Sequence, residues 1–133
     1  MGVTEHMGLF LLVCLGGTLG TAARYVLGVS IQAAYGPTFP VGTLSVNLIG
    51  SFLVSMLMVL GVDKGLISTP ARVVLCTGVL GGFTTYSSFN FETMRLWQQG
   101  SILMGFLNVG LTVVGCLAAG ALGLLTGRLI GGA

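Results

Sequence analysis

Charged side chains are scarce in this sequence of 133 residues. Five are Lys or Arg and three are Asp or Glu, so that 6% of the chain is charged, whereas 54% is hydrophobic. An ordinary soluble domain is about a quarter charged, because a domain of this size has a large surface to cover. The scarcity excludes a soluble enzyme, a nucleic-acid-binding protein and a disordered chain, and it indicates that the solvent is mostly lipid. The net charge of +2, with no basic cluster, likewise argues against nucleic acid as a partner.

Clustered metal ligands and paired cysteines are missing too. Cys14, Cys76 and Cys116 are odd in number, far apart and each inside an apolar run. Since a disulfide framework needs an even number and a zinc site needs clustered ligands, we interpret them as small packing residues. No nucleophile–base pair is evident, which predicts that the protein is not an enzyme.

Long apolar runs are what the sequence has in abundance. A membrane-spanning helix needs about 20 mostly apolar residues, and four runs reach that length, at residues 8–29, 41–62, 72–97 and 101–130. These runs are too long for membrane strands of about ten residues and lack their strict alternation. The sequence therefore predicts one all-α domain over residues 1–133 with four transmembrane helices.

The few positive charges are nearly balanced across the membrane. Four spans place both termini on one side together with Lys64, Arg72 and Arg128, and they leave Arg24 and Arg95 for the other side. A difference of one charge hardly favours either orientation under the positive-inside rule. Two interpretations stay open: a single orientation set by one charge, or insertion in both directions, in which case two copies can form an antiparallel homodimer.

Small and polar residues recur every four positions within the runs. Glycines at this spacing let helices approach closely in lipid: Gly16 and Gly20, Gly78 and Gly82, and Gly123 and Gly127. Polar groups at this spacing share a helix face: Asn47, Ser51 and Ser55 in the second run, and Asn108, Thr112 and Cys116 in the fourth. The two polar stripes either line one narrow path or bond within and between helices.

The third run contains poor helix formers near its middle. Gly81 and Gly82 are followed by the β-branched residues Thr84 and Thr85. We predict that the helix is broken here and that backbone carbonyls are freed. Irregular backbone at this depth is tolerated only where it is buried in protein or lines a cavity, and freed carbonyls bind Na⁺ in transporters with broken helices.

Two aromatic residues and one acidic residue follow the predicted break, and one arginine lies in the first run. Tyr86 and Phe89 share a helix face, where their electropositive ring edges either face an anion or simply pack. Glu92 either pairs with Arg95 on the helix surface or acts in gating or proton-linked transport. Arg24 either extends to the membrane interface or places a positive potential at a pore mouth.

Three short motifs stand in the first three runs: GTAARY at residues 20–25, GTLSVNLIG at 42–50 and GGFTTYSSF at 81–89. Together they closely resemble the signatures of the Fluc (CrcB) family of fluoride channels, and chain length, number of spans and motif order agree over nearly the whole sequence. The resemblance implies a dual-topology antiparallel homodimer in a bacterial-type inner membrane. Two antiparallel pores per dimer would carry fluoride passively down its gradient and so lower cytoplasmic fluoride.

The resemblance also implies roles for individual residues. The backbone carbonyls of Gly81 and Thr84 would hold a central Na⁺ at the dimer interface, completed by the same pair from the second copy. Arg24 and Glu92 would lie at the vestibule or act in gating. The family usually has Phe at the position of Tyr86, whose hydroxyl adds a hydrogen-bond donor. The fluoride pore would be lined by Asn47, Tyr86, Phe89, Ser87, Ser88, Asn108 and Thr112.

Two other functions remain open: a small dual-topology, proton-coupled multidrug exporter, and a non-catalytic subunit of a membrane complex. An exporter needs a carboxylate in the middle of a span, whereas Glu5 precedes the first run and Glu92 lies beyond the predicted break. We therefore favour the channel, with fluoride, Na⁺, a second copy of the chain and the lipid bilayer as its partners.

Overall fold

A computed structural model of the chain describes residues 3–132, and over that range all regular structure is helical. The elements are α1 (Val3–Tyr35), α2 (Val41–Met58), the π-helical η1 (Val59–Asp63), α3 (Thr69–Arg72), the π-helical η2 (Val73–Leu80), α4 (Gly81–Phe83), α5 (Tyr86–Gln98) and α6 (Ile102–Ile130). The prediction of an all-α protein is confirmed.

Three of the helical stretches are long and apolar enough to cross a membrane: His6–Tyr35, Val41–Asp63 and Ile102–Ile130. The first is longer than predicted at both ends, because helical backbone continues through the polar residues up to Tyr35. The third predicted run is divided among α3, η2, α4 and α5. A membrane crossing by these four segments together belongs to the proposal below.

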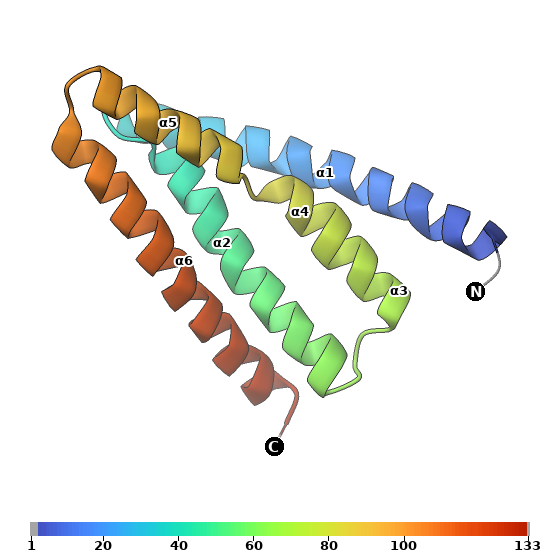
Figure 1. Cartoon of the computed structure of the whole chain (residues 1–133). Coiled ribbons are helices and arrows are strands. Elements are labelled where there is room, and N and C mark those ends of the chain that lie inside the picture. Colours follow the sequence, from blue (N-terminus) through green and yellow to red (C-terminus); the bar gives the residue numbers. More distant parts are fainter. Residues whose placement is uncertain (1–2, 133) are drawn as a thin grey trace.

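Helix α2 lies at the centre of the bundle (Figure 1). It packs along α6 on one side and against α1 on another, while α1 also packs along η2 and α4. The glycine spacing accounts for the tightness of these contacts. A Cβ atom added to Gly82 would lie 2.5 Å from the Gly17 carbonyl oxygen of α1, and one added to Gly123 would collide with the Phe52 carbonyl of α2. The predicted close approach of glycine-bearing helices is confirmed.

The chain leaves the helical conformation between α4 and α5. Thr84 (φ −83°, ψ 159°) and Thr85 (φ −151°, ψ 110°) are both extended. Of the four residues that predicted the break, Gly81 and Gly82 are helical, and Thr84 and Thr85 are the extended ones. Gly82 packs closely against α1, and the β-branched threonines, which favour extended backbone, take up the irregular conformation.

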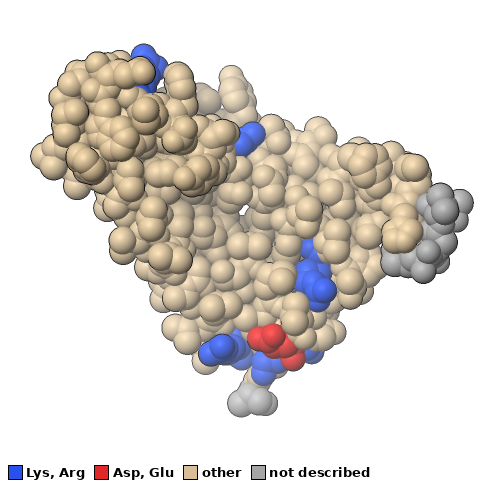
Figure 2. All heavy atoms as spheres, viewed as in Figure 1, with Lys and Arg blue, Asp and Glu red and all other residues tan. Residues whose placement is uncertain are grey.

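Charged groups lie toward the two ends of the molecule, and a broad band of uncharged atoms separates them (Figure 2). Large apolar side chains are exposed along α1 and α6, including Leu19 and Leu129. In water such a surface is unfavourable, whereas hydrocarbon solvates it. The distribution is that of a multi-pass membrane protein.

Candidate functional site

The side chain of Asn47 in α2 holds the extended segment in place. Its Nδ2 donates to the Thr85 carbonyl oxygen at 3.0 Å, and its Oδ1 accepts from the Thr85 backbone N–H at 2.7 Å. Both residues are buried. In a continuous α-helix the Thr85 amide would donate to the Gly81 carbonyl. Asn47 thus replaces the helical partner of Thr85 and leaves the Gly81 carbonyl without it.

Thr85 also begins the next helix. Its Oγ1 accepts from the Ser88 backbone N–H at 3.2 Å, which is an N-cap interaction, and it donates to Ser88 Oγ at 2.9 Å. The Ser88 amide would otherwise donate to the Thr84 carbonyl. Two carbonyls, those of Gly81 and Thr84, therefore lose their helical donors, and these are the two that the resemblance assigns to Na⁺.

These two carbonyls are ligands of the kind that a hard cation binds, and one of them also accepts a hydrogen bond from α1. Oxygen atoms are the ligands that such cations prefer, and both residues line the same cavity. The Thr84 carbonyl also accepts from Arg24 Nη1 at 3.3 Å. A carbonyl oxygen has two lone pairs, so it can serve both, although the guanidinium charge opposes a second positive charge at the same atom. The residues fit Na⁺ if a second copy completes the set.

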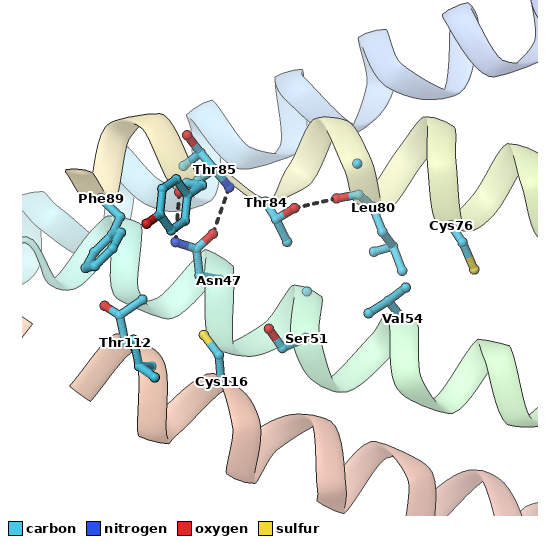
Figure 3. A pocket seen from close by; sticks show the side chains of 14 residues that line it. Asn47, Ser51, Val54, Cys76, Leu80, Thr84, Thr85, Phe89, Thr112 and Cys116 are labelled. Atoms are coloured by element: carbon cyan, nitrogen blue, oxygen red, sulfur yellow. Dashed lines mark hydrogen bonds between the residues drawn. The ribbon is translucent and has the colours of Figure 1, made fainter. Parts of the chain in front are cut away.

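A cavity of about 400 Å³, here called the central cavity, opens beside the extended segment between α2, η2 and α6 (Figure 3). Both predicted polar stripes reach it, through Asn47 and Ser51 of α2 and through Thr112 and Cys116 of α6. These members of the two stripes therefore meet at one cavity, whereas Ser55 and Asn108 do not line it. Six of the predicted site residues line this cavity: Asn47, Gly81, Thr84, Tyr86, Phe89 and Thr112.

The aromatic pair forms one wall of the central cavity. The ring centroids of Tyr86 and Phe89 are 5.4 Å apart and their planes are inclined by 61°, an edge-to-face arrangement. Phe89 is 6% exposed, whereas Tyr86 is 79% exposed. Phe89 is therefore packed inside the bundle, whereas Tyr86 leaves most of its surface exposed.

A second cavity of about 400 Å³, here called the α1-side cavity, lies on the other side of the extended segment. It is lined by Arg24, Ser88 and Glu92, and Thr85 lines both cavities. Glu92 Oε1 accepts from Thr43 Oγ1 at 2.7 Å, and Oε2 is buried without a hydrogen-bond partner. Glu92 is thus held by α2 and does not use Arg95, which corrects the alternative of a surface pair.

Two predicted pore residues lie off these cavity walls. Ser87 is exposed and its Oγ is 3.4 Å from Thr85 Oγ1. Asn108 is 1% exposed and lies between α6 and α5, where its Nδ2 donates to Thr93 Oγ1 at 2.8 Å. Thr93 Oγ1 in turn donates to the Phe89 carbonyl at 2.8 Å. Asn108 therefore reaches the aromatic pair through α5 and does not line the central cavity.

Sequence reasoning missed several contributors. Thr43 and Thr93 went unmarked because a lone hydroxyl in a membrane helix usually bonds its own backbone, as Thr84 does with the Leu80 carbonyl. Cys76 was interpreted as a packing residue, yet it lines the central cavity. Cys116 lines this cavity too, and its place in the polar stripe of the fourth run was the signal for it.

The helices and cavities define a multi-pass helical membrane protein whose polar groups meet inside the bundle. A family model described as "CrcB-like protein, Camphor Resistance (CrcB)" matches residues 11–124. The chain belongs to the CrcB family, which confirms the resemblance.

Curated relatives are matched over nearly their whole length. A protein of Sorangium cellulosum is 50% identical over 114 residues, which are 86% of this chain and 90% of that one. A protein of Anaeromyxobacter dehalogenans is 45% identical over 126 residues, 95% of this chain and all of the relative. Both are named "Fluoride-specific ion channel FluC". The family is one of ion channels, so the prediction that the chain is not an enzyme is confirmed.

Proposed function

We propose that the protein is a fluoride-selective channel that passes fluoride down its gradient across a bacterial-type inner membrane and so lowers cytoplasmic fluoride. The names of the relatives support this function, and so does the position of Asn47 at the wall of the central cavity. Fluoride is small and strongly hydrated, and a selective pore must replace its water with other hydrogen-bond donors. The cavities offer such donors where lipid offers none.

The amide of Asn47 is the observation that carries the proposal. An Asn amide has two N–H donors and one carbonyl oxygen. Thr85 uses one of these donors and the oxygen, so one N–H is left at the wall of the central cavity. Because the oxygen is occupied by the Thr85 amide, the side chain cannot turn over without losing both bonds. The orientation of the amide is therefore fixed, and Asn47 keeps one N–H that can donate to an anion.

The proposed route runs from the α1-side cavity past Thr85 to the central cavity. Arg24, which donates to the Thr84 carbonyl, attracts the anion within the α1-side cavity, and the hydroxyl groups of Ser87 and Ser88 offer donors near the extended segment. Tyr86 and Phe89 present ring edges, and Thr112 adds a hydroxyl from α6. Asn108 supports the aromatic pair through Thr93. Glu92, held by Thr43, lies at the end of the hydroxyl groups.

A second copy in antiparallel orientation completes the proposed site and gives two pores. The 79% exposure of Tyr86 leaves a wall for another chain to supply. A central Na⁺ held by Gly81 and Thr84 of both copies would raise the potential near the path for an anion. In this assembly α3 to α5 act together as the third of four membrane spans, interrupted at Thr84 and Thr85.

The test is anion efflux from liposomes that contain purified protein, with fluoride and chloride compared under valinomycin. Fast fluoride efflux with little chloride efflux supports the proposal, and no fluoride flux from a well-folded preparation refutes it. Glu92 Oε2, buried without a partner, is the feature that favours the alternative of a proton-coupled multidrug exporter. Proton-dependent uptake of a cationic dye by the same vesicles, without fluoride flux, would establish that alternative.

A further inference from the structure

Three of the five positively charged residues gather at one end of the bundle, away from both cavities. Lys64 follows η1, Arg72 ends α3, and Arg128 lies in the last turn of α6. Figure 2 shows basic groups in the lower part of the molecule, beside an acidic group. Asp63 is the acidic residue of the same segment, so these four residues together carry an excess of two positive charges.

Two of these side chains pack against glycines. The position of a Cβ on Gly61 would be 2.9 Å from Arg72 Cδ, so the arginine stem packs against the middle of η1. A Cβ on Gly131 would be 3.0 Å from Lys64 Cδ, so the lysine stem lies over the end of α6. Lys64 Nζ also donates to the Gly132 carbonyl. The Arg72 side chain is thereby held against η1, and the Lys64 side chain is held over the end of α6.

Exposed apolar side chains surround this basic end. Leu66 lies in the connection between η1 and α3, and Leu129 and Ile130 follow Arg128 directly; all three are exposed, Leu129 to 83%. Cations at the end of membrane helices, with apolar side chains beside them, match a phospholipid, whose phosphate lies at the interface and whose acyl chains lie deeper.

We propose that Lys64, Arg72 and Arg128 bind the phosphate of an anionic phospholipid, such as phosphatidylglycerol, at the joint of η1, α3 and α6. The aliphatic stems packed on Gly61 and Gly131 limit the freedom of two of the cations, so less conformational entropy is lost on binding. The three donors of a lysine ammonium leave two for the ligand after Gly132 takes one. The site is independent of fluoride conduction.

The experiment is native mass spectrometry of the full chain in detergent, with phosphatidylglycerol or phosphatidylcholine added. We expect a preference for phosphatidylglycerol that weakens as salt rises. Replacing Lys64, Arg72 and Arg128 by Gln, singly and together, should weaken its binding about fivefold for each side chain, the ratio that corresponds to roughly 1 kcal/mol per basic residue at a membrane surface. The matched control, Arg95→Gln, removes one charge at the opposite end and should leave binding unchanged.

Three results would overturn the proposal: equal binding of the two lipids, equal loss in Arg95→Gln, or inorganic phosphate that competes at the concentration of the lipid, since the last would indicate a site for free anions. If a Gln variant fails to fold, Lys64→Arg and Arg128→Lys retain the charge and must retain the preference. Fluoride efflux is measured separately on the same preparations. Loss of lipid binding with normal efflux, and loss of efflux with normal lipid binding, are therefore distinguishable results.

Discussion

Replacing Asn47 by Asp tests the proposed pathway at its most constrained residue. The substitution keeps the shape of the side chain and keeps the acceptor of the Thr85 amide, 2.7 Å away. It removes the donor to the Thr85 carbonyl and the remaining N–H of the amide. When ionised, it places a negative charge at the wall of the central cavity.

The expected loss of flux is large. Two like charges about 4 Å apart repel by roughly 4 kcal/mol at an effective dielectric constant of about 20, which corresponds to a slowing of about 10²- to 10³-fold. Losing one hydrogen bond between helices in a membrane costs about 1 kcal/mol, and burying the charge adds a further cost. Both costs are shared by a control that makes the same change in another buried amide, so the loss of flux beyond that control is the informative quantity.

Asn108→Asp is the matched control, because it makes the same chemical change in another buried amide. Asn108 lies between α5 and α6 and lines neither cavity. We expect a similar loss of thermal stability, measured by fluorescence-detected size exclusion, and a much smaller loss of fluoride efflux. Fluoride efflux at the wild-type rate from monodisperse Asn47→Asp protein would contradict the role of Asn47, and an equal loss in both variants would attribute it to packing alone.

Further predictions concern the aromatic pair, the central cation and the helix contacts. Phe89→Ile should slow fluoride efflux about two- to tenfold by removing a ring edge, whereas Phe91→Ile, at an exposed position of the same helix, should not; normal efflux in the first would reduce the aromatic wall to packing. Prolonged removal of Na⁺ should weaken the dimer or the flux, as seen by size exclusion and efflux, and indifference would remove the proposed cation. Gly82→Ala should destabilise the protein by about 1–3 kcal/mol, because its Cβ would meet the Gly17 carbonyl. Gly110→Ala, with open space around it, should be neutral; equal melting temperatures would refute the close contact with α1.

The helical class and the helix contacts are predictable from the sequence because lipid leaves few choices. In hydrocarbon, each backbone polar group must bond internally, so long apolar runs are helical. Glycines four apart then indicate where two backbones meet, as Gly123 meets the Phe52 carbonyl. Helix ends are harder, because α1 continues beyond its apolar core to Tyr35 and nothing in hydropathy marks that boundary.

Helix propensity locates the irregular segment between α4 and α5 but does not say which of its residues are extended. Weak helix formers at residues 81–85 identify the region, but they do not distinguish a glycine that bends the chain from one that lets a neighbour approach. Gly82 is of the second kind. The extended residues are Thr84 and Thr85, and they are stable there because Asn47, distant in sequence, bonds the Thr85 backbone. A partner 38 residues away is not visible in local propensity.

The residues that sequence reasoning finds and those it misses differ in a physical way. Asn47, Glu92 and Asn108 are costly in hydrocarbon, so their presence in an apolar run indicates function or a specific partner. Their partners are Thr residues or backbone groups, which cost little because a hydroxyl can bond its own helix. Thr43 and Thr93 therefore carry no signal of their own, although they hold Glu92 and Asn108 at 2.7 and 2.8 Å. A substitution of a hydroxyl partner, such as Thr43→Val, leaves the polar group in place and removes only the bond that orients it. Such variants therefore distinguish a conduction pathway, which depends on that orientation, from a polar core, which does not.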